Sequence, residues 1–179
     1  SNHIPFNHLE NKKVLEIGLG YGSVSQKIME AGAVYHGIDI AKGPVEFVKH
    51  RANLGQYVVE AQLGSALAIP YPDNSFDSVI SIGCLHHTGD LEKACKEVVR
   101  VAKPNGSVHL MLYSAHSHRQ FLAYPIRWLR ALIFSEYVHK ENNINTEHRA
   151  KYDSNSENEV APHTVLTSAN DIGVLLSDL

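Results

Sequence analysis

The feature that most constrains the fold is a short apolar segment that runs straight into a glycine-rich turn. Residues Lys13–Ile17 are followed by Gly18–Gly22, with the sequence GLGYG, and apolar residues then recur at helical spacing up to Ala31. Glycine lets the backbone turn tightly and approach a ligand, and the start of a helix offers free N–H groups. The pattern therefore predicts a strand, a ligand-binding turn and a helix of the kind found at nucleotide sites.

Strand-like and helix-like segments alternate beyond this turn. The further predicted strands are Val34–Asp39, Tyr57–Val59, Phe76–Ile82 and Val108–Leu112, and the predicted helices are Val24–Ala31, Val45–Ala52 and Leu91–Ala102. Strands that alternate with helices form βαβ units with right-handed crossovers, so we expect an α/β fold with a mostly parallel sheet.

Composition limits the class of protein and its partners. The chain has 179 residues, with 16 Lys and Arg against 19 Asp and Glu, for a formal net charge of −3. This balance disfavours nucleic acid as the main partner. Two cysteines, Cys84 and Cys95, are too few for a disulfide framework and indicate a cytoplasmic location. No apolar run approaches the ~20 residues of a membrane span. The first residues show no basic segment followed by an apolar one, so we do not expect a secreted protein.

Asp39 stands where a nucleoside ligand would need a carboxylate. It ends the second predicted strand, 21 residues after Gly18, and can there bind both hydroxyls of a ribose. Two features disfavour a dinucleotide: Gly22 comes one residue too early for G-x-G-x-x-G, leaving Ser23 in the third glycine place, and Glu16 lies close by. A carboxylate suits a cationic ligand better than a pyrophosphate, so an NAD-dependent oxidoreductase is the weaker alternative.

Five segments together resemble one enzyme family. They are Leu15–Gly22, Gly37–Ile40, Gly64–Asp77, Gly83–His87 and Arg100–Gly106. In this order and spacing they are similar to the class I S-adenosylmethionine (SAM)-dependent methyltransferases, in the ubiquinone-biosynthesis-like methyltransferase type 11 subgroup. The resemblance covers residues 12–114 and implies a Rossmann-like, doubly wound α/β fold with strand order 3-2-1-4-5.

The resemblance also implies an organisation for the whole chain. We expect residues 1–179 to form a single methyltransferase domain, with a core at 12–114 and a helix and lid-like segment at 115–179. Members of the family normally add strands 6 and 7, but no hydrophobic hairpin follows Val165, so we expect both strands to be missing and the chain to be truncated at its C-terminus. A homodimer, or the helix after Tyr113, would then cover strand 5.

The resemblance assigns cofactor contacts to individual residues. With Glu16 added from its charge, the predicted SAM-binding residues are Glu16, Gly18, Gly20, Tyr21, Gly22, Asp39, Ile40, Ser65, Ala66 and Gly83. Asp39 would bind the ribose and Ile40 would flank the adenine. Ser65 departs from the family, which usually has Asp there. Its hydroxyl can still accept from the adenine amino group, with affinity lower by about 1 kcal/mol. Asn105 replaces a usual glycine and tolerates the same left-handed turn.

The implied reaction is in-line transfer of a methyl group from SAM to a small-molecule acceptor, which leaves S-adenosylhomocysteine. The alternative is a SAM-binding module or degenerate partner subunit without its own activity. His86 and His87 are the catalytic candidates, since a histidine can remove a proton from an acceptor. Yet this displacement depends mainly on orientation, so one of them could instead line the pocket while the other is structural. His116 and His118 lack a third ligand at metal spacing, so we predict no metal site.

The last third of the chain has a different character. Apolar residues over Phe121–Ile133 form a helical stripe among arginines, which indicates a helix that covers the sheet or the site, or, as the weaker alternative, one that binds a membrane surface. Ser135–His163 is polar and is predicted to be a lid, a linker or a disordered segment. Ser168–Leu176 is predicted to be one more short helix.

Overall fold

The computed structural model describes residues 6–114, 165, 167 and 172, and the chain divides into two compact units. The first unit holds Ser1–Leu85 and Lys93–Met111, and the second holds His86–Glu92 and Leu112–Leu179. Every strand of the sheet lies in the first unit.

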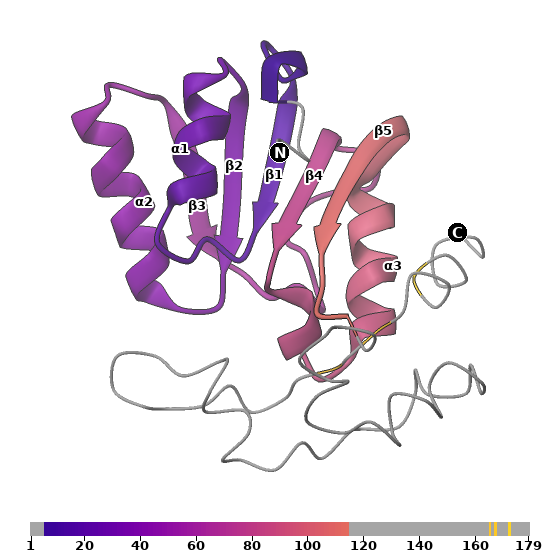
Figure 1. Cartoon of the computed structure of the whole chain (residues 1–179). Helices are drawn as coiled ribbons and strands as arrows, with labels where there is room; N and C mark the ends of the chain where they lie inside the picture. The colour runs from indigo at the N-terminus through magenta and orange to yellow at the C-terminus, as the bar shows by residue number, and fades with distance from the viewer. Residues whose placement is uncertain (1–5, 115–164, 166, 168–171, 173–179) are drawn as a thin grey trace. The chain divides into compact units, whose positions relative to one another are not determined.

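The first unit is built on a sheet of five parallel strands, in the order β3-β2-β1-β4-β5. The strands are β1 Lys13–Ile17, β2 Val34–Asp39, β3 Val59–Leu63, β4 Phe76–Ile82 and β5 Ala102–Met111. Their carboxyl ends point to one edge of the sheet (Figure 1). This order confirms the predicted doubly wound α/β fold. It reverses between β1 and β4, the place where open α/β sheets bind ligands.

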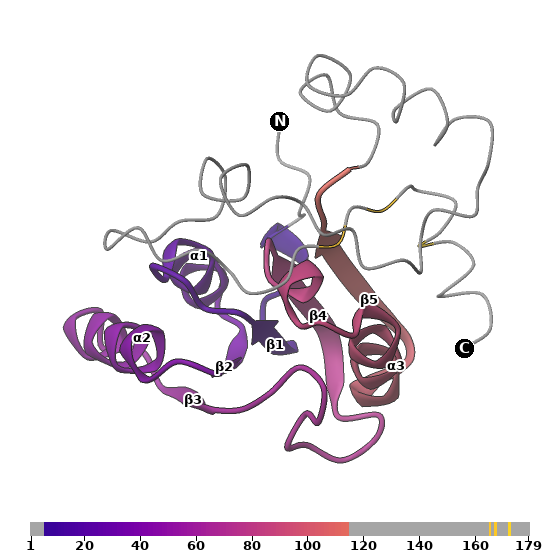
Figure 2. The ribbon, with the colours of Figure 1, turned by 90° about the horizontal axis from the view of Figure 1, so that it is seen from below.

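Helices cover both faces of this sheet. They are α1 Ser23–Glu30, α2 Lys42–Leu54 and α3 Leu91–Val101, with short 3₁₀ turns η1 Phe6–His8 and η2 Leu85–His87. Seen along the strands, α1 and α2 lie on one face and α3 on the other (Figure 2). The α2 helix buries Val45, Val48 and Ala52, which recur every three or four residues and so form one apolar stripe.

One cluster of the core lies between the sheet and the pair α1 and α2. In the parallel register Val14 is opposite Tyr35, and both side chains are almost fully buried. They pack in one cluster with Ile28, Val45 and Ile80. Central parallel strands are buried on both faces, which explains why their sequences are nearly continuous apolar runs.

Two strand predictions need correction. The third strand is Val59–Leu63, not Tyr57–Val59, and Val58 is 95% exposed. The fifth begins at Ala102, not Val108, and ends at Met111. Its pairing with β4 has an irregularity, in which Asn105 adopts φ 64°, so the predicted left-handed turn is confirmed within a longer strand.

Several expectations concern parts of the chain that the structure does not describe. The predicted helix over Phe121–Ile133 and the lid over Ser135–His163 lie wholly outside the described residues, and the helix over Ser168–Leu176 lies almost wholly outside them. In the described part of the chain, no helix has both the length and the apolarity to cross a membrane.

Candidate cofactor-binding site

The glycine-rich turn after β1 has left-handed backbone at all three glycines. The φ angles are 82° at Gly18, 49° at Gly20 and 68° at Gly22, values that other residues adopt only with strain. A Cβ at Gly18 would overlap Cys84, whereas a Cβ at Gly20 would meet no atom of the described residues within 4 Å. Gly18 is therefore required for packing, and the described part of the chain leaves space beside Gly20 that a ligand can occupy.

Asp39 at the end of β2 is fixed against this turn. Its Oδ2 accepts the N–H of Leu19 at 2.8 Å and its Oδ1 accepts the N–H of Ala41 at 2.9 Å. The turn is also joined to β2 through the N–H of Gly18, which donates to the carbonyl of Ile38 at 2.9 Å. Each carboxylate oxygen has capacity for a further hydrogen bond, so the half-buried Asp39 can accept from two neighbouring hydroxyl groups.

The segment after β3 reaches the same carboxylate residue. The N–H of Gly64 donates to the backbone carbonyl of Asp39 at 3.0 Å, and Ser65 and the buried Ala66 follow directly. The Ser65 hydroxyl accepts the N–H of Leu67 at 3.1 Å and so stabilises the local turn. A hydroxyl oxygen has a second lone pair, which leaves the predicted contact with an adenine amino group chemically open.

The residues directly after β4 form the last described part of this candidate site, which we call the cradle. Gly83 has φ 70° and donates its N–H to the carbonyl of Met111 at 3.0 Å. The next residue, Cys84, packs on Gly18. Burial and the nearby charge of Asp39 raise the pKa of the Cys84 thiol to about 11, so the thiol stays protonated at neutral pH. A protonated thiol is a poor nucleophile, and the role of Cys84 here is to pack against Gly18.

Two large side chains border this site and remain accessible. Tyr21 in the glycine turn is 80% exposed, and Ile40, directly after Asp39, is 81% exposed. Large exposed side chains beside fixed polar groups are available to contact a ligand.

Glu16 is buried beneath the turn instead of opening toward solvent. Its side chain accepts hydrogen bonds from the hydroxyls of Ser25 on α1 and Tyr35 on β2. Burial raises the pKa of Glu16 to about 7, against the lowering effect of these two hydrogen bonds, and the charge of Asp39 raises it further. A Cβ at Gly37 would overlap the Tyr35 hydroxyl, so glycine there makes room for the network. Glu16 thus ties α1 and β2 to β1, and its contact with a cofactor stays a prediction.

The two candidate catalytic histidines belong to the second unit. His86 is fully buried, with its ring centroid 4.0 Å from that of His87 and 4.1 Å from that of Tyr113. Its carbonyl accepts the N–H of Val165 at 2.9 Å. His87 is half-buried. The catalytic assignment of His86 and His87 stays a prediction. Among the described residues, no three His, Cys, Asp or Glu side chains form a group that could hold a metal.

An ion-pair cluster on α3 anchors the loop that carries Ser65 and Ala66. Arg100 donates to Glu97 at 2.7 and 2.8 Å and to Asp73 at 2.8 Å. It also donates to the carbonyls of Ile69 and Tyr71 at 3.0 and 2.9 Å. The charge of Asp73 is therefore used structurally, a role that no local sequence pattern indicates.

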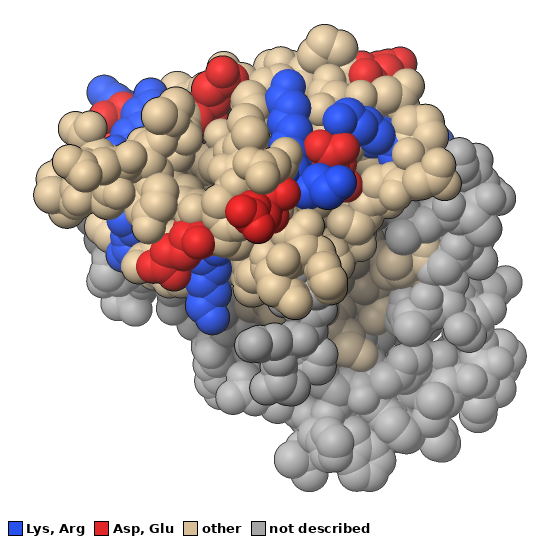
Figure 3. Space-filling view, turned by 90° about the horizontal axis from the view of Figure 1, so that it is seen from above, with Lys and Arg blue, Asp and Glu red and all other residues tan. Residues whose placement is uncertain are grey.

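Basic and acidic side chains are interspersed in the view from above, where no large area of one sign stands out (Figure 3). Among the pairs in the first unit, Lys103 binds Asp77 at 2.8 Å, and Asp77 also accepts the N–H of Lys13 at 2.9 Å. These bonds lower the pKa of Asp77, mainly through Lys103. They join the starts of β1, β4 and β5, far along the strands from the cradle.

Two of the curated relatives are methyltransferases with a quinone in their names. The demethylmenaquinone methyltransferase of Tropheryma whipplei (strain Twist) is 28% identical over 131 residues, which cover 70% of this chain and 54% of that protein. The ubiquinone biosynthesis O-methyltransferase of Pseudomonas fluorescens (strain SBW25) is 30% identical over 135 residues, or 74% of this chain and 54% of that protein. The chain thus spans about half the length of these curated relatives.

Solved structures share the fold. The YcgJ protein from Bacillus subtilis matches with a TM-score of 0.67 and 23% identity, over 96% of this chain and 63% of that one. A SAM-dependent methyltransferase from Aquifex aeolicus matches with a TM-score of 0.51 and 28% identity, over 55% of each chain. The family model described as a methyltransferase domain matches residues 15–110, more than half of the sequence. The chain belongs to the methyltransferase domain family.

Proposed function

We propose that this protein is a SAM-dependent methyltransferase that acts on a small-molecule acceptor. The observation that carries the proposal is the carboxylate of Asp39, held by the N–H of Leu19 in the glycine turn and by the N–H of Ala41. This arrangement presents two fixed acceptor oxygens beside a turn whose middle glycine borders space that the described residues leave open. A nucleoside with a ribose and a flexible amino-acid tail fits both features.

The described residues would hold SAM in a defined order. Asp39 would accept from the two ribose hydroxyls, and the turn Gly18–Gly22 would lie along the methionine part. Gly83 would lie near the amino group of that part. Ile40 would flank the adenine, and Ser65 with Ala66 would border its edge. SAM supplies a methyl group on a positively charged sulfur. What the protein then contributes is orientation, because an in-line displacement requires the acceptor atom to face that methyl group.

The proposed acceptor is a small molecule, and quinone precursors are the first compounds to test. The support is that both curated relatives described above have a quinone in their names. We also expect a cytoplasmic location, on the cysteine content. A SAM-binding module without activity is the alternative, and it differs from the enzyme only in the transfer step.

Calorimetric titration with S-adenosylhomocysteine tests the site. Asp39→Ala removes a partly buried carboxylate that would accept two hydrogen bonds from the ribose. The affinity for S-adenosylhomocysteine should fall about 10- to 150-fold. The control is Glu46→Ala, which removes an exposed carboxylate on α2 and should leave affinity unchanged. Unchanged affinity in Asp39→Ala would refute the ribose assignment, and tighter binding of NAD would refute the choice of cofactor. Binding of SAM without methyl transfer to any member of a broad acceptor panel would favour the module.

A further inference from the structure

We propose that Arg51 is a positioning residue that holds the end of the glycine turn and thereby sets cofactor affinity without contacting the cofactor. The inference rests on the proposed function, since it concerns the same turn. It adds a residue from the last turn of α2 that the sequence analysis did not identify.

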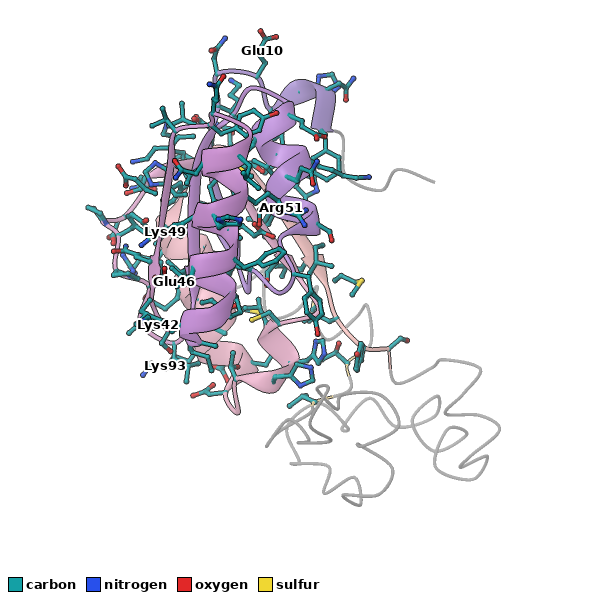
Figure 4. All side chains as sticks on the ribbon, turned by 90° about the vertical axis from the view of Figure 1, so that its left-hand side faces the viewer. Glu10, Lys42, Glu46, Lys49, Arg51 and Lys93 are labelled. Carbon is teal, nitrogen blue, oxygen red and sulfur yellow. The ribbon has the colours of Figure 1, made fainter. Side chains whose placement is uncertain are left out.

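The contacts of Arg51 run from α2 to the start of α1. Its Nη1 donates to the side-chain oxygen of Gln26 at 2.6 Å and to the backbone carbonyl of Gly22 at 3.4 Å. Figure 4 shows Arg51 on the side of α2 that faces α1, with Lys49 and Glu46 on the other side. The guanidinium carbon also lies 5.0 Å from the ring centroid of Phe47, one helical turn earlier, a cation–π contact that favours this orientation.

The carbonyl that Arg51 reaches is the first acceptor of α1. Gly22 is the residue before the helix, and its carbonyl accepts the N–H of Gln26 at 3.0 Å. Arg51 therefore binds the carbonyl of Gly22, which accepts this first helical bond, and the side chain of Gln26, whose N–H donates it. Among the described residues no side chain caps the N–H groups at Gly22, and the guanidinium, which only donates, does not do so. What Arg51 adds is a tie from α2 to the Gly22 carbonyl and Gln26, beside the bond of Ser25 to Glu16.

Packing at Gly22 brings the same helix close. The residue is buried with φ 68°, and a Cβ there would lie 3.3 Å from a methyl group of Val48 and 3.5 Å from the ring of Phe47. The other end of the turn is held by Asp39, which accepts the N–H of Leu19. The turn is thus fixed at Leu19 from β2 and at Gly22 from α2, with the open position Gly20 between the two ties.

Binding of a ligand to this turn costs less conformational entropy when the turn is already ordered in the free protein. Loss of the Arg51 tie should leave the sheet intact and let Gly20–Gly22 fluctuate. The cost would then appear in cofactor affinity and in local amide exchange, not in the unfolding of the whole unit. If Arg51 only packed α1 against α2, its loss would instead lower the overall stability and speed amide exchange in both helices equally.

The test compares Arg51→Met with Lys49→Met, a matched loss of one positive charge from the exposed side of the same helix. Titration with S-adenosylhomocysteine should show affinity about 5-fold weaker for Arg51→Met and unchanged for Lys49→Met. Amide exchange in the ligand-free protein should become faster at residues 20–25 in Arg51→Met alone. Arg51→Lys should recover part of both effects, since it keeps the charge but loses the planar fork.

Three outcomes would overturn the inference. They are unchanged affinity and exchange in Arg51→Met, an equal effect of Lys49→Met, and faster exchange throughout the sheet together with a lower unfolding temperature. If the unaltered protein does not bind S-adenosylhomocysteine, the proposed function fails on its own. Local exchange at residues 20–25 then still decides whether Arg51 holds the turn.

Discussion

At the scale of single residues, Gly18 and Gly20 require glycine for different reasons. Both have left-handed backbone, so alanine at either costs about 1–2 kcal/mol of stability. Only at Gly18 would the added Cβ also overlap Cys84. We expect Gly18→Ala to lower the free energy of unfolding clearly more than Gly20→Ala, as measured by urea titration.

Affinity for S-adenosylhomocysteine should respond in Gly20→Ala, because a methyl group there enters the space assigned to the ligand. Gly43→Ala is the control: Gly43 lies in α2 with ordinary helical backbone, and an added Cβ would meet no described atom within 4 Å. The free energy of unfolding of Gly43→Ala should rise by about 0.5–1 kcal/mol, and its affinity for S-adenosylhomocysteine should be unchanged. Equal losses of stability in Gly18→Ala and Gly20→Ala would contradict this account of the turn.

The predictable part of the site is the part that the chain presents locally. Glycines at a strand end and Asp39 at the next strand end follow from short spacings and parallel topology. The contact of Cys84 with Gly18 and that of Arg51 with Gly22 join residues far apart in sequence. No local pattern encodes such contacts, because they depend on how β4 and α2 pack.

At the scale of the elements, the same distinction separates the strands. Central β1 and β4 are apolar runs with clear turns before them, and both were predicted at the residues observed. The edge strand β3 was misplaced because the apolar run Tyr57–Val59 resembles a buried strand. The observed β3 contains the polar residues Glu60 and Gln62, with only Ala61 buried. An edge strand is exposed to solvent on one side, so its sequence is a weaker signal.

The loop between β3 and β4 should depend on Arg100 of α3. Arg100→Met would leave the carbonyls of Ile69 and Tyr71 and the carboxylate of Glu97 without this partner. We expect a loss of about 2 kcal/mol in the free energy of unfolding and weaker binding of S-adenosylhomocysteine, since the loop carries Ser65. Urea unfolding and calorimetric titration measure the two effects.

The matched variant is Asp73→Asn, which removes only one exposed charge from the same cluster. Exposed ion pairs contribute about 0–1 kcal/mol, so this variant should lose much less stability than Arg100→Met. Similar losses in both variants would mean that the ion pair, and not the backbone contacts, stabilises the loop.

At the scale of the whole molecule, two buried groups on neighbouring strands make stability depend on pH in opposite ways. Burial raises the pKa of Glu16 from 4.5 to about 7. His36 is buried against Tyr71 and Phe76, and burial lowers its pKa from 6.5, with Lys13 acting in the same direction. The carboxylate of Glu60, 2.9 Å from Nδ1 of His36, opposes this lowering.

The direction of each effect follows from which state binds the proton. Between pH 4.5 and about 7, folded Glu16 keeps a proton that the unfolded chain has released. The contribution of Glu16 to the free energy of unfolding is therefore complete below pH 4.5 and is lost as pH rises to about 7. The full difference is about 3 kcal/mol. His36 acts in reverse, because the unfolded chain takes up its proton first as pH falls below 6.5, and stability falls with it. Below pH 6.5 the two slopes therefore oppose each other.

Removing either group should expose the slope of the other. In Glu16→Gln the free energy of unfolding should rise with pH between about 5 and 7, and in His36→Gln it should fall more steeply than in the unaltered protein. Urea unfolding at several pH values measures both slopes, with Glu46→Gln, an exposed carboxylate on α2, as the control that keeps the original profile. If Glu16→Gln keeps the profile of the unaltered protein, Glu16 does not titrate in this range. The hydrogen bonds from Ser25 and Tyr35 would then outweigh the cost of its burial.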